Sequence, residues 1–302
     1  MLCAFQMQKL VGIIGVPLIH GQRRIGVSKA PNALRQAGLL RVIEGCGWKT
    51  QDYGNIDFTD TLRNVPYNET RFDSITNHIY NTTRIAARNN QFTLALGGNH
   101  SISGGTIRAM RETFPSLGVV WVDAHADANT REHSPSGNYH GMVAAELMGW
   151  FGANAHLPEN KLVYIGLRDL DPIESRMLSD SKAHVFMMSD IIEHGVEYVI
   201  HKTLEILHDC PLHLSLDIDS IDPVYAPGTG TPVSGGMTYS EVKCICKALA
   251  RSGRMVSIDL VEINPELDEV KDEKLVTVQV GLELIKTVFR CNKISQKLPC
   301  VE

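Results

Sequence analysis

The chain has 302 residues and a mass of 33.4 kDa, and 43% of its residues are hydrophobic and 21% charged. This composition excludes an intrinsically disordered chain, which combines low hydrophobicity with a high net charge. The net charge of −5 and a pI near 6.2 argue against nucleic-acid binding through a basic surface. We predict a single domain over residues 1–302, because α/β domains of this length are common.

The sequence has no features of a membrane-spanning or secreted protein. No apolar run approaches the length of about 18 residues that a transmembrane helix needs. The cysteine count, seven, is odd, and the chain is long, so a disulfide framework is not expected. The segment Met1–Leu10 has no charged side chain before Lys9 and no long apolar core, unlike a signal or transit peptide. We expect a reduced, cytosolic protein that binds no membrane, and a mitochondrial location stays open.

Short apolar runs alternate with segments of helical length along the chain. The runs predict strands at Leu10–Val16, Phe92–Leu96, Gly118–Val122, Leu162–Ile165, Val185–Met188, Leu212–Ile218 and Met255–Leu260, with a weaker one before Tyr53. The intervening segments predict helices at Phe72–Asn89, Ile191–His208 and Tyr239–Ser252. Such alternation is typical of βαβ units. We therefore predict an α/β fold in which a mostly parallel sheet of about eight strands carries helices on both faces.

Acidic and histidine residues follow three of the predicted strands. Phe92–Leu96 is followed by Gly97-Gly98-Asn99-His100, and Gly118–Val122 by Asp123-Ala124-His125-Ala126-Asp127. The run Leu212–Ile218 ends at Asp217-Ile218-Asp219. Ligands of parallel α/β sheets bind at the carboxyl ends of the strands, so these residues are expected at one edge. If the segments are extended, residues two positions apart point to the same side.

Taken singly, each of these residues has an ordinary structural explanation. An Asp after a strand usually caps a helix or stabilises a turn. Four carboxylates at one edge, however, would repel one another strongly without cations. We therefore predict a metal site, with these ligands: His100, Asp123, His125, Asp127, Asp217 and Asp219.

The residue types indicate which metal this site takes. The predicted ligands include no thiolate, which disfavours structural zinc and iron–sulfur clusters. The charge of four carboxylates is balanced by two divalent ions. Oxygen-rich ligation with histidine suits Mn²⁺, with Fe²⁺, Co²⁺ or Zn²⁺ as alternatives. A pair of such ions lowers the pKa of a bound water, so the predicted reaction is a hydrolysis.

These motifs resemble the metal motifs of the ureohydrolase family, and within it the sequence is most similar to arginases. The resemblance runs from Gly12 to about Leu284. Two loops, Ser136–Gly141 and Gly166–Pro172, resemble the substrate loops of arginases, which agmatinases do not share in this form. The family fold is an eight-stranded parallel α/β sheet, in agreement with the strands predicted above.

The resemblance implies two Mn²⁺ ions per chain, with Asp123 and Asp217 bridging them. The ligands of one ion would be His100, Asp123, Asp127 and Asp217, and those of the other Asp123, His125, Asp217 and Asp219. Asp127 would also accept a hydrogen bond from a hydroxide that bridges the ions. His140 corresponds to the family's catalytic histidine, which shuttles a proton or stabilises the substrate.

The resemblance also implies that L-arginine is hydrolysed to L-ornithine and urea. The α-carboxylate of the substrate would contact Asn129, Ser136 and Asn138. Its α-amino group would contact Asp171, with help from Glu174. The guanidinium end would face Thr231 and Glu262, and Glu262 would act in catalysis together with Asp127 and His140. Without the resemblance, the loop residues among these would be ordinary turn formers.

The sequence departs from the family pattern at several positions, and two of them bear on metal affinity and assembly. Asn99 stands where the family usually has Asp, and if that residue orients His100, the amide should lower metal affinity by about 10–100-fold. Ser240 stands where many animal arginases have an Arg tied to trimer contacts. We still expect a homo-oligomer, with a trimer as the favoured form.

Two other functions stay open at this point. The first is an agmatinase or another ureohydrolase with a guanidino substrate, and Ser136-Gly137-Asn138 argues against it. The second is a metal-poor, non-catalytic binding relative, against which the complete set of predicted ligands argues. A Rossmann-type nucleotide site is disfavoured, because the glycines around the first motif do not have the G-x-G-x-x-G spacing.

Overall fold

The fold was analysed in a computed structural model that describes residues 9–63, 69–152 and 155–292. Nearly all of the segment Met1–Leu10, together with Cys3 and Cys300, lies outside the described residues. The other five cysteines are free thiols, as expected for a reduced protein. Among the helices of the described ranges, none has the length and apolar character needed to cross a membrane.

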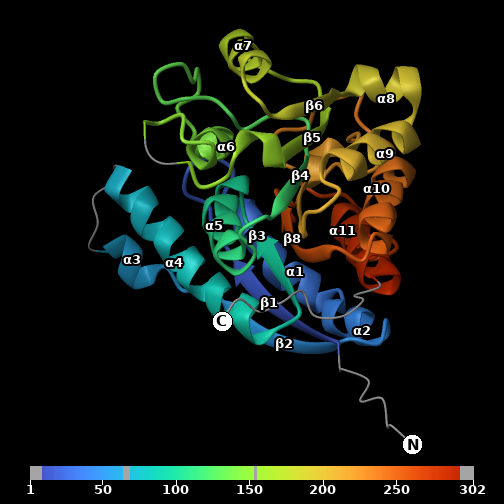
Figure 1. The fold of residues 1–302 in the computed structure, drawn as a ribbon. Helices are drawn as coiled ribbons and strands as arrows, with labels where there is room; N and C mark the ends of the chain where they lie inside the picture. The colour runs from blue at the N-terminus through green and yellow to red at the C-terminus, as the bar shows by residue number, and fades with distance from the viewer. Residues whose placement is uncertain (1–8, 64–68, 153–154, 293–302) are drawn as a thin grey trace, which may run out of the picture.

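The core of the molecule is one eight-stranded sheet with the strand order β2-β1-β3-β8-β7-β4-β5-β6 (Figure 1). Every pair of neighbouring strands is parallel, which confirms the predicted architecture. The strands are β1 (Leu10–Val16), β2 (Lys49–Asn55), β3 (Phe92–Gly97), β4 (Gly118–Val122), β5 (Leu162–Leu167), β6 (His184–Met187), β7 (Leu212–Asp217) and β8 (Met255–Val261). A short antiparallel pair, β9 (Val270–Lys271) and β10 (Lys274–Leu275), was not predicted.

Helices cover both faces of the sheet, because its strands are apolar on both sides. One face packs against α1 (Ala30–Gln36), α2 (Leu39–Glu44), α8 (Met188–His194), α9 (Val196–Ile206), α10 (Tyr239–Arg251) and α11 (Val276–Cys291). The other packs against α4 (Glu69–Asn89), α5 (Ser103–Thr113), α6 (Val143–Leu147) and α7 (Pro172–Asp180). The short helix α3 (Thr59–Arg63) lies beside α4.

The predicted helices at Phe72–Asn89 and Tyr239–Ser252 correspond to α4 and α10. At the start of α10, Thr238 and Glu241 form the capping box that their spacing indicates.

The prediction of one helix over Ile191–His208 is wrong. Two helices occupy this segment, and Gly195 separates them with φ 83° and ψ 154°. This conformation is far from helical and is open mainly to glycine, so the chain changes direction there. The apolar periodicity continues on both sides of Gly195, which is why the sequence pattern resembles a single helix.

The order of the strands determines where a site can form. β3 and β4 are consecutive along this part of the chain, but β8 and β7 lie between them in the sheet. The carboxyl ends of these four central strands are therefore neighbours at one edge, where ligands of such sheets bind.

Candidate metal centre and active site

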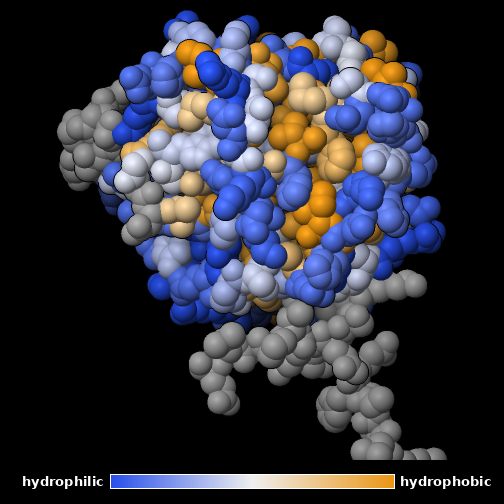
Figure 2. Space-filling model, turned by 45° about the horizontal axis from the view of Figure 1, so that its top comes forward, coloured by the Kyte–Doolittle hydropathy of each residue, from blue (hydrophilic) through white to orange (hydrophobic). Residues whose placement is uncertain are grey.

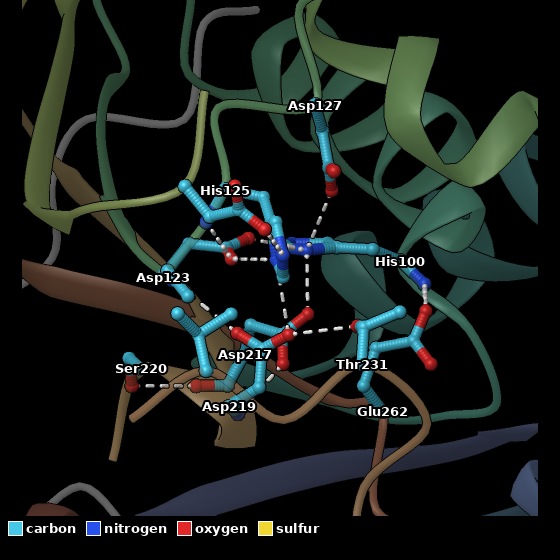
Figure 3. Close-up of polar contacts among 12 residues, drawn as sticks. His100, Asp123, His125, Asp127, Asp217, Asp219, Ser220, Thr231 and Glu262 are labelled. Atoms are coloured by element: carbon cyan, nitrogen blue, oxygen red, sulfur yellow. Dashed lines mark hydrogen bonds and ion pairs between the residues drawn. The ribbon is translucent and has the colours of Figure 1, made fainter. Parts of the chain in front are cut away.

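Acidic and histidine side chains from three strand ends meet at the carboxyl edge of the sheet (Figure 3). His100 begins a 3₁₀ turn after β3, and Asp217 is the last residue of β7. Of the six predicted metal ligands, His125 is partly exposed and the other five are buried. The structure thus brings together the six predicted ligands His100, Asp123, His125, Asp127, Asp217 and Asp219.

Three carboxylate oxygens surround the Nδ1 atom of His100. The Oδ2 atom of Asp123 lies 3.0 Å from it, and the Oδ2 atoms of Asp127 and Asp217 lie 3.1 Å from it. No aligned hydrogen bond from the described residues reaches this buried nitrogen. The imidazole ring is stacked on Trp121, with the ring centroids 4.1 Å apart. One nitrogen and three oxygens therefore face a common point, as the ligands of a cation do.

A second cluster shares Asp123 with the first. The Nδ1 atom of His125 lies 3.1 Å from Oδ2 of Asp219 and 3.6 Å from Oδ1 of Asp123. In each cluster the possible ligand atoms lie within 4.8 Å of one another. Asp123 thus presents one oxygen to each histidine. The bridging role of Asp217 stays a prediction, because its Oδ2 faces His100 while its Oδ1 accepts a hydrogen bond from the Asp219 backbone, 2.9 Å away.

Turns, and not an extended backbone, bring these side chains together. Asp219 lies in the 3₁₀ turn Ile218–Ser220, and Asp217 caps this turn with its side chain. Asp127 has a φ of 49°, in the left-handed region that non-glycine residues rarely adopt. The expectation of an extended chain at Asp217–Asp219 is therefore wrong, although the side chains still converge. Such unfavourable backbone conformations often occur at functional sites.

Burial of several carboxylates in one place perturbs their ionisation. Desolvation and repulsion by neighbouring carboxylates raise the pKa of Asp217 and Asp219, and they raise the pKa of Asp127 to about 6. Burial also opposes ionisation of Asp123, but the hydrogen bonds and charges of the two histidines outweigh this effect and lower its pKa. Full ionisation of all four carboxylates therefore calls for additional positive charge in the cluster.

These residues fit a pair of divalent cations. The ligand atoms are carboxylate oxygens and imidazole nitrogens, without a thiolate, which suits hard or intermediate metal ions. The buried Nδ1 of His100 has a free position for a ligand bond. Two divalent ions would also balance the charge of the four carboxylates and remove the repulsion described above.

Neighbouring groups hold the carboxylates in place. The indole N–H of Trp121 donates to Oδ2 of Asp123 over 2.9 Å. The hydroxyl of Thr231 donates to Oδ2 of Asp219 over 3.1 Å, and the backbone N–H of Ala124 donates to its Oδ1 over 3.2 Å. The observed role of Thr231 is thus to orient a predicted ligand, while its contact with the substrate guanidinium stays a prediction.

Asn99 does not orient His100. Its side chain accepts a hydrogen bond from the backbone of Ser101 at 3.1 Å and donates one to the carbonyl of His20 at 2.8 Å. The Nε2 atom of His100 instead contacts the hydroxyl of Ser215 at 2.8 Å. The expected loss of metal affinity, which depended on a contact between Asn99 and His100, therefore has no structural basis.

A cavity of about 220 Å³ opens beside the metal ligands. Its wall combines predicted ligands with residues of the two predicted substrate loops. The lining residues are His125, Asp127, Asn129, Ser136, Asn138, His140, Gly141, Asp169, Asp171, Glu174, Asp217, Asp219 and Thr231. The sequence assigned no role to Asp169, whose Oδ2 lies 3.5 Å from Nε2 of His125.

The residues predicted to bind the amino-acid end of a substrate are linked to one another. The side chain of Asn129 donates to Oδ2 of Asp171 over 2.8 Å, and the buried Oδ1 of Asn129 has no partner among the described residues. Glu174 is buried and accepts hydrogen bonds from the backbones of Ala128 and Asp171 at 2.8 and 3.3 Å. Burial raises the pKa of Glu174 to about 7, and the negative charge of Asp127 adds to this effect. Glu174 thus ties the segment that follows β4 to the loop Gly166–Pro172.

The remaining loop residues lie at the rim of the cavity. Ser136 is exposed, and its hydroxyl accepts a hydrogen bond from the backbone of Asn138 at 3.2 Å. Gly137 between them has φ 66°, a conformation that glycine adopts without strain. The contacts of Ser136 and Asn138 with a substrate carboxylate stay predictions.

His140 and Glu262 form a pair next to the metal ligands. Nδ1 of His140 lies 3.1 Å from Oε1 of Glu262, which also accepts a hydrogen bond from the backbone of His100 at 2.9 Å. Burial disfavours a charged His140, but the hydrogen bond and charge of Glu262 outweigh burial and raise the pKa of the imidazole. Glu262, with φ 60°, is buried and is not one of the residues that line the cavity. Its predicted guanidinium contact stays a prediction.

The chain is similar to known proteins in both sequence and structure. The sequence matches the Arginase family over residues 9–288. It is 38% identical to the arginase of Staphylococcus aureus, and the match covers 93% of this chain and 97% of that protein. The structure resembles the arginase of Bacillus caldovelox with a TM-score of 0.85 and 33% identity, over 97% of this chain and 100% of that one. It resembles an Entamoeba histolytica arginase bound to L-ornithine with a TM-score of 0.83 and 30% identity, over 94% and 99% of the two chains.

Proposed function

This chain belongs to the arginase family, and from this premise we propose that it hydrolyses L-arginine to L-ornithine and urea with two Mn²⁺ ions per chain. The observation that carries the proposal is the pair of histidine–aspartate clusters that share Asp123 beside a polar cavity. A hydrolase of this class needs both a metal pair and a cavity that recognises a polar substrate.

The metal pair would be held by the ligands that the sequence predicts: His100, Asp123, His125, Asp127, Asp217 and Asp219. When bound, such a pair acts as a Lewis acid that lowers the pKa of water and supplies a nucleophile at neutral pH. Manganese is the preferred identity because the ligands are oxygen-rich and include histidine.

The loops at the rim of the cavity would bind the amino-acid end of arginine. Asp171 would accept hydrogen bonds from the α-ammonium group. The unpartnered Oδ1 of Asn129 is an acceptor beside it, so we assign Asn129 to the ammonium group and not, as the sequence predicts, to the α-carboxylate. The amide of Asn138 and the hydroxyl of Ser136 would donate to the α-carboxylate. This arrangement directs the guanidinium group inward, toward the predicted metal ligands.

His140 would then handle the proton of the reaction. Its Nδ1 is held by Glu262, so its Nε2 is the atom that delivers a proton to the departing amine nitrogen. The hydrogen bond and charge of Glu262 raise the pKa of His140 and so favour its protonated form. Oε2 of Glu262 forms no hydrogen bond with the described residues, so it is available to accept one from the guanidinium group.

Urea release from L-arginine and from agmatine tests this function, because agmatine lacks the α-carboxylate. With manganese-loaded protein, we expect kcat/KM to be at least about a hundredfold higher for L-arginine, since agmatine leaves polar groups of the loops unpaired. Asn138→Ala should raise KM for L-arginine and leave agmatine hydrolysis unchanged. Equal efficiency with agmatine would indicate an agmatinase, and no hydrolysis of either compound would indicate a binding relative.

We also propose that the enzyme is a cytosolic homo-oligomer, with a trimer as the first arrangement to test. Apolar side chains gather between hydrophilic ones on the face shown in Figure 2, which is typical of surfaces that associate. A cytosolic location agrees with the five free thiols. It also agrees with the complete burial of Asn99, which begins the N-glycosylation pattern Asn99-His100-Ser101 and could not carry a glycan in this fold. Sedimentation analysis would measure the number of chains per particle.

A further inference from the structure

A row of buried polar residues lies behind the metal ligands, under helix α5. His213 and Ser215 on β7 are the register partners of Ser257 and Asp259 on β8. All four are at most 1% exposed, and none lines the cavity. Polar groups in the middle of a parallel sheet are costly unless they are hydrogen-bonded. This row therefore needs an explanation other than contact with substrate.

A line of hydrogen bonds connects Asp259 to His100. The hydroxyl of Ser103, the first residue of α5, lies 3.1 Å from Oδ2 of Asp259. The same hydroxyl lies 3.0 Å from that of Ser215, which lies 2.8 Å from Nε2 of His100. All of these side chains are buried, so water does not compete for the hydrogen bonds.

The carboxylate at the end of this line determines the direction of every hydrogen bond in it. A carboxylate has no hydrogen to donate, so Ser103 must donate its only hydroxyl hydrogen to Asp259. Ser103 can then only accept from Ser215, which has no further hydrogen for His100. Ser215 must therefore accept from His100, and the proton of the imidazole has to lie on Nε2. The lone pair of Nδ1 consequently points toward the carboxylates of the first metal cluster.

We propose that Asp259 is a positioning residue that, through Ser103 and Ser215, fixes the tautomer and orientation of His100 for metal binding. This inference rests on the proposed dinuclear centre. The hydroxyl of Thr106 also donates to Oδ2 of Asp259, and Nε2 of His213 lies 3.3 Å from that atom. Of these two neighbours only Thr106 makes a hydrogen bond to the carboxylate, and neither is part of the line to His100.

The test compares two variants, each of which removes one of the hydroxyl groups that donate a hydrogen bond to Asp259. Ser103→Ala interrupts the line to His100, whereas Thr106→Val removes an equally buried hydrogen bond outside it. The affinity of the metal-free protein for Mn²⁺ is measured by competition with a chelator. We expect Ser103→Ala to weaken the binding of one ion by about tenfold, while Thr106→Val keeps the affinity of the wild type.

The Nε2–H proton of His100 provides a second readout that is independent of activity. It is recorded by NMR on protein labelled with ¹⁵N-histidine and loaded with diamagnetic Zn²⁺. The proton should be observable and slow to exchange in the wild type and in Thr106→Val. In Ser103→Ala its resonance should move and its exchange with water should accelerate, because Ser215 no longer has a fixed orientation.

Equal loss of affinity in the two variants would overturn the proposal, because it would indicate a general effect on packing. Unchanged affinity and an unchanged His100 resonance in Ser103→Ala would also overturn it. If Ser103→Ala does not fold, Ser103→Cys keeps the volume but donates poorly, and the same results are expected. A wild-type protein that binds two ions but releases no urea from L-arginine would contradict the proposed function alone, since the positioning of His100 would stand.

Discussion

At the scale of single residues, Glu262 links three functional groups. It accepts hydrogen bonds from the backbone of His100 and the ring of His140, and it is the predicted partner of the substrate guanidinium. Glu262→Gln keeps the volume and removes the charge. Loss of a buried, charged pair of this kind costs about 2–5 kcal/mol, so kcat/KM for L-arginine should fall on the order of a hundredfold. Steady-state urea release at saturating Mn²⁺ measures this, with the bound metal quantified in the same sample.

The pH profile of the same variant tests the pairing with His140. Glu262 raises the pKa of His140, and a proton-donating His140 is active only below its pKa. In Glu262→Gln the alkaline limb of the profile should therefore move to lower pH. Glu241→Gln is the matched control, because it changes a capping-box residue of α10 that does not line the cavity, and it should leave activity unchanged. A Glu262→Gln enzyme within a few-fold of the wild type would rule out the guanidinium contact, and loss of metal would show that the change disturbs the metal centre.

Glu174 makes a separate prediction about stability. Burial raises its pKa in the folded protein to about 7 from an ordinary value of 4.5. The folded state therefore binds this proton more tightly, and the resulting stabilisation is complete below pH 4.5 and is lost as the pH rises through about 7. Glu174→Gln removes this dependence. From pH 4.5 to above about 7, the free energy of unfolding of Glu174→Gln, relative to that of the wild type, should rise by about 3 kcal/mol.

Urea denaturation of both proteins at several pH values between 4.5 and 8 measures this difference. The variant loses one acceptor for the backbones of Ala128 and Asp171, but this loss is the same at every pH. Parallel stability curves for the two proteins would show that folding does not raise the pKa of Glu174.

At the scale of secondary structure, Gly195 is the position where sequence and structure differ most clearly. It separates α8 from α9 with φ 83°, and a Cβ added there would meet only Oε2 of Glu197, at 3.7 Å. Gly195→Ala should therefore lower the free energy of unfolding by about 1–3 kcal/mol through backbone strain alone. Gly45→Ala is the control for backbone strain, because Gly45 has φ −62°, a conformation open to every residue, and its Cβ would lie 3.2 Å from the carbonyl oxygen of Arg41. A stability equal to the wild type would mean that the two helices can join, and kcat/KM should not change in either variant.

The strands were predictable and the turns at their ends were not. Runs such as Phe92–Leu96 and Gly118–Val122 are apolar throughout, because the sheet is buried on both faces. The turn at Ile218–Ser220 is held by local hydrogen bonds from Asp219 and Ser220 to Asp217, a pattern that the prediction did not use, and the positive φ of Asp127 has no signal in the spacing of residues. His213, Ser215 and Asp259 carried a signal that the prediction did not use, since they are polar residues alternating with apolar ones inside buried strands.

At the scale of the whole molecule, the candidate site depends on strand order. The sequence shows that three strands end in acidic and histidine residues, but only the topology places β3, β8, β7 and β4 next to one another. The position of Asn99 shows the limit of arguments from sequence. Its backbone place beside His100 was known, yet its side chain contacts Ser101 and His20. Side-chain direction follows from packing, which the sequence pattern alone does not specify.

The most direct test of the central claim is a titration of the metal-stripped protein with Mn²⁺, in which urea release from L-arginine and bound metal are measured at each point. We predict no turnover without metal and maximal turnover at about two ions per chain. Asp217→Ala, which removes a carboxylate within 3.1 Å of His100 Nδ1, should bind fewer ions and remain inactive, while Glu241→Gln should titrate like the wild type. Full turnover by the metal-stripped protein, or a full set of ions and full activity in Asp217→Ala, would contradict the dinuclear centre described here.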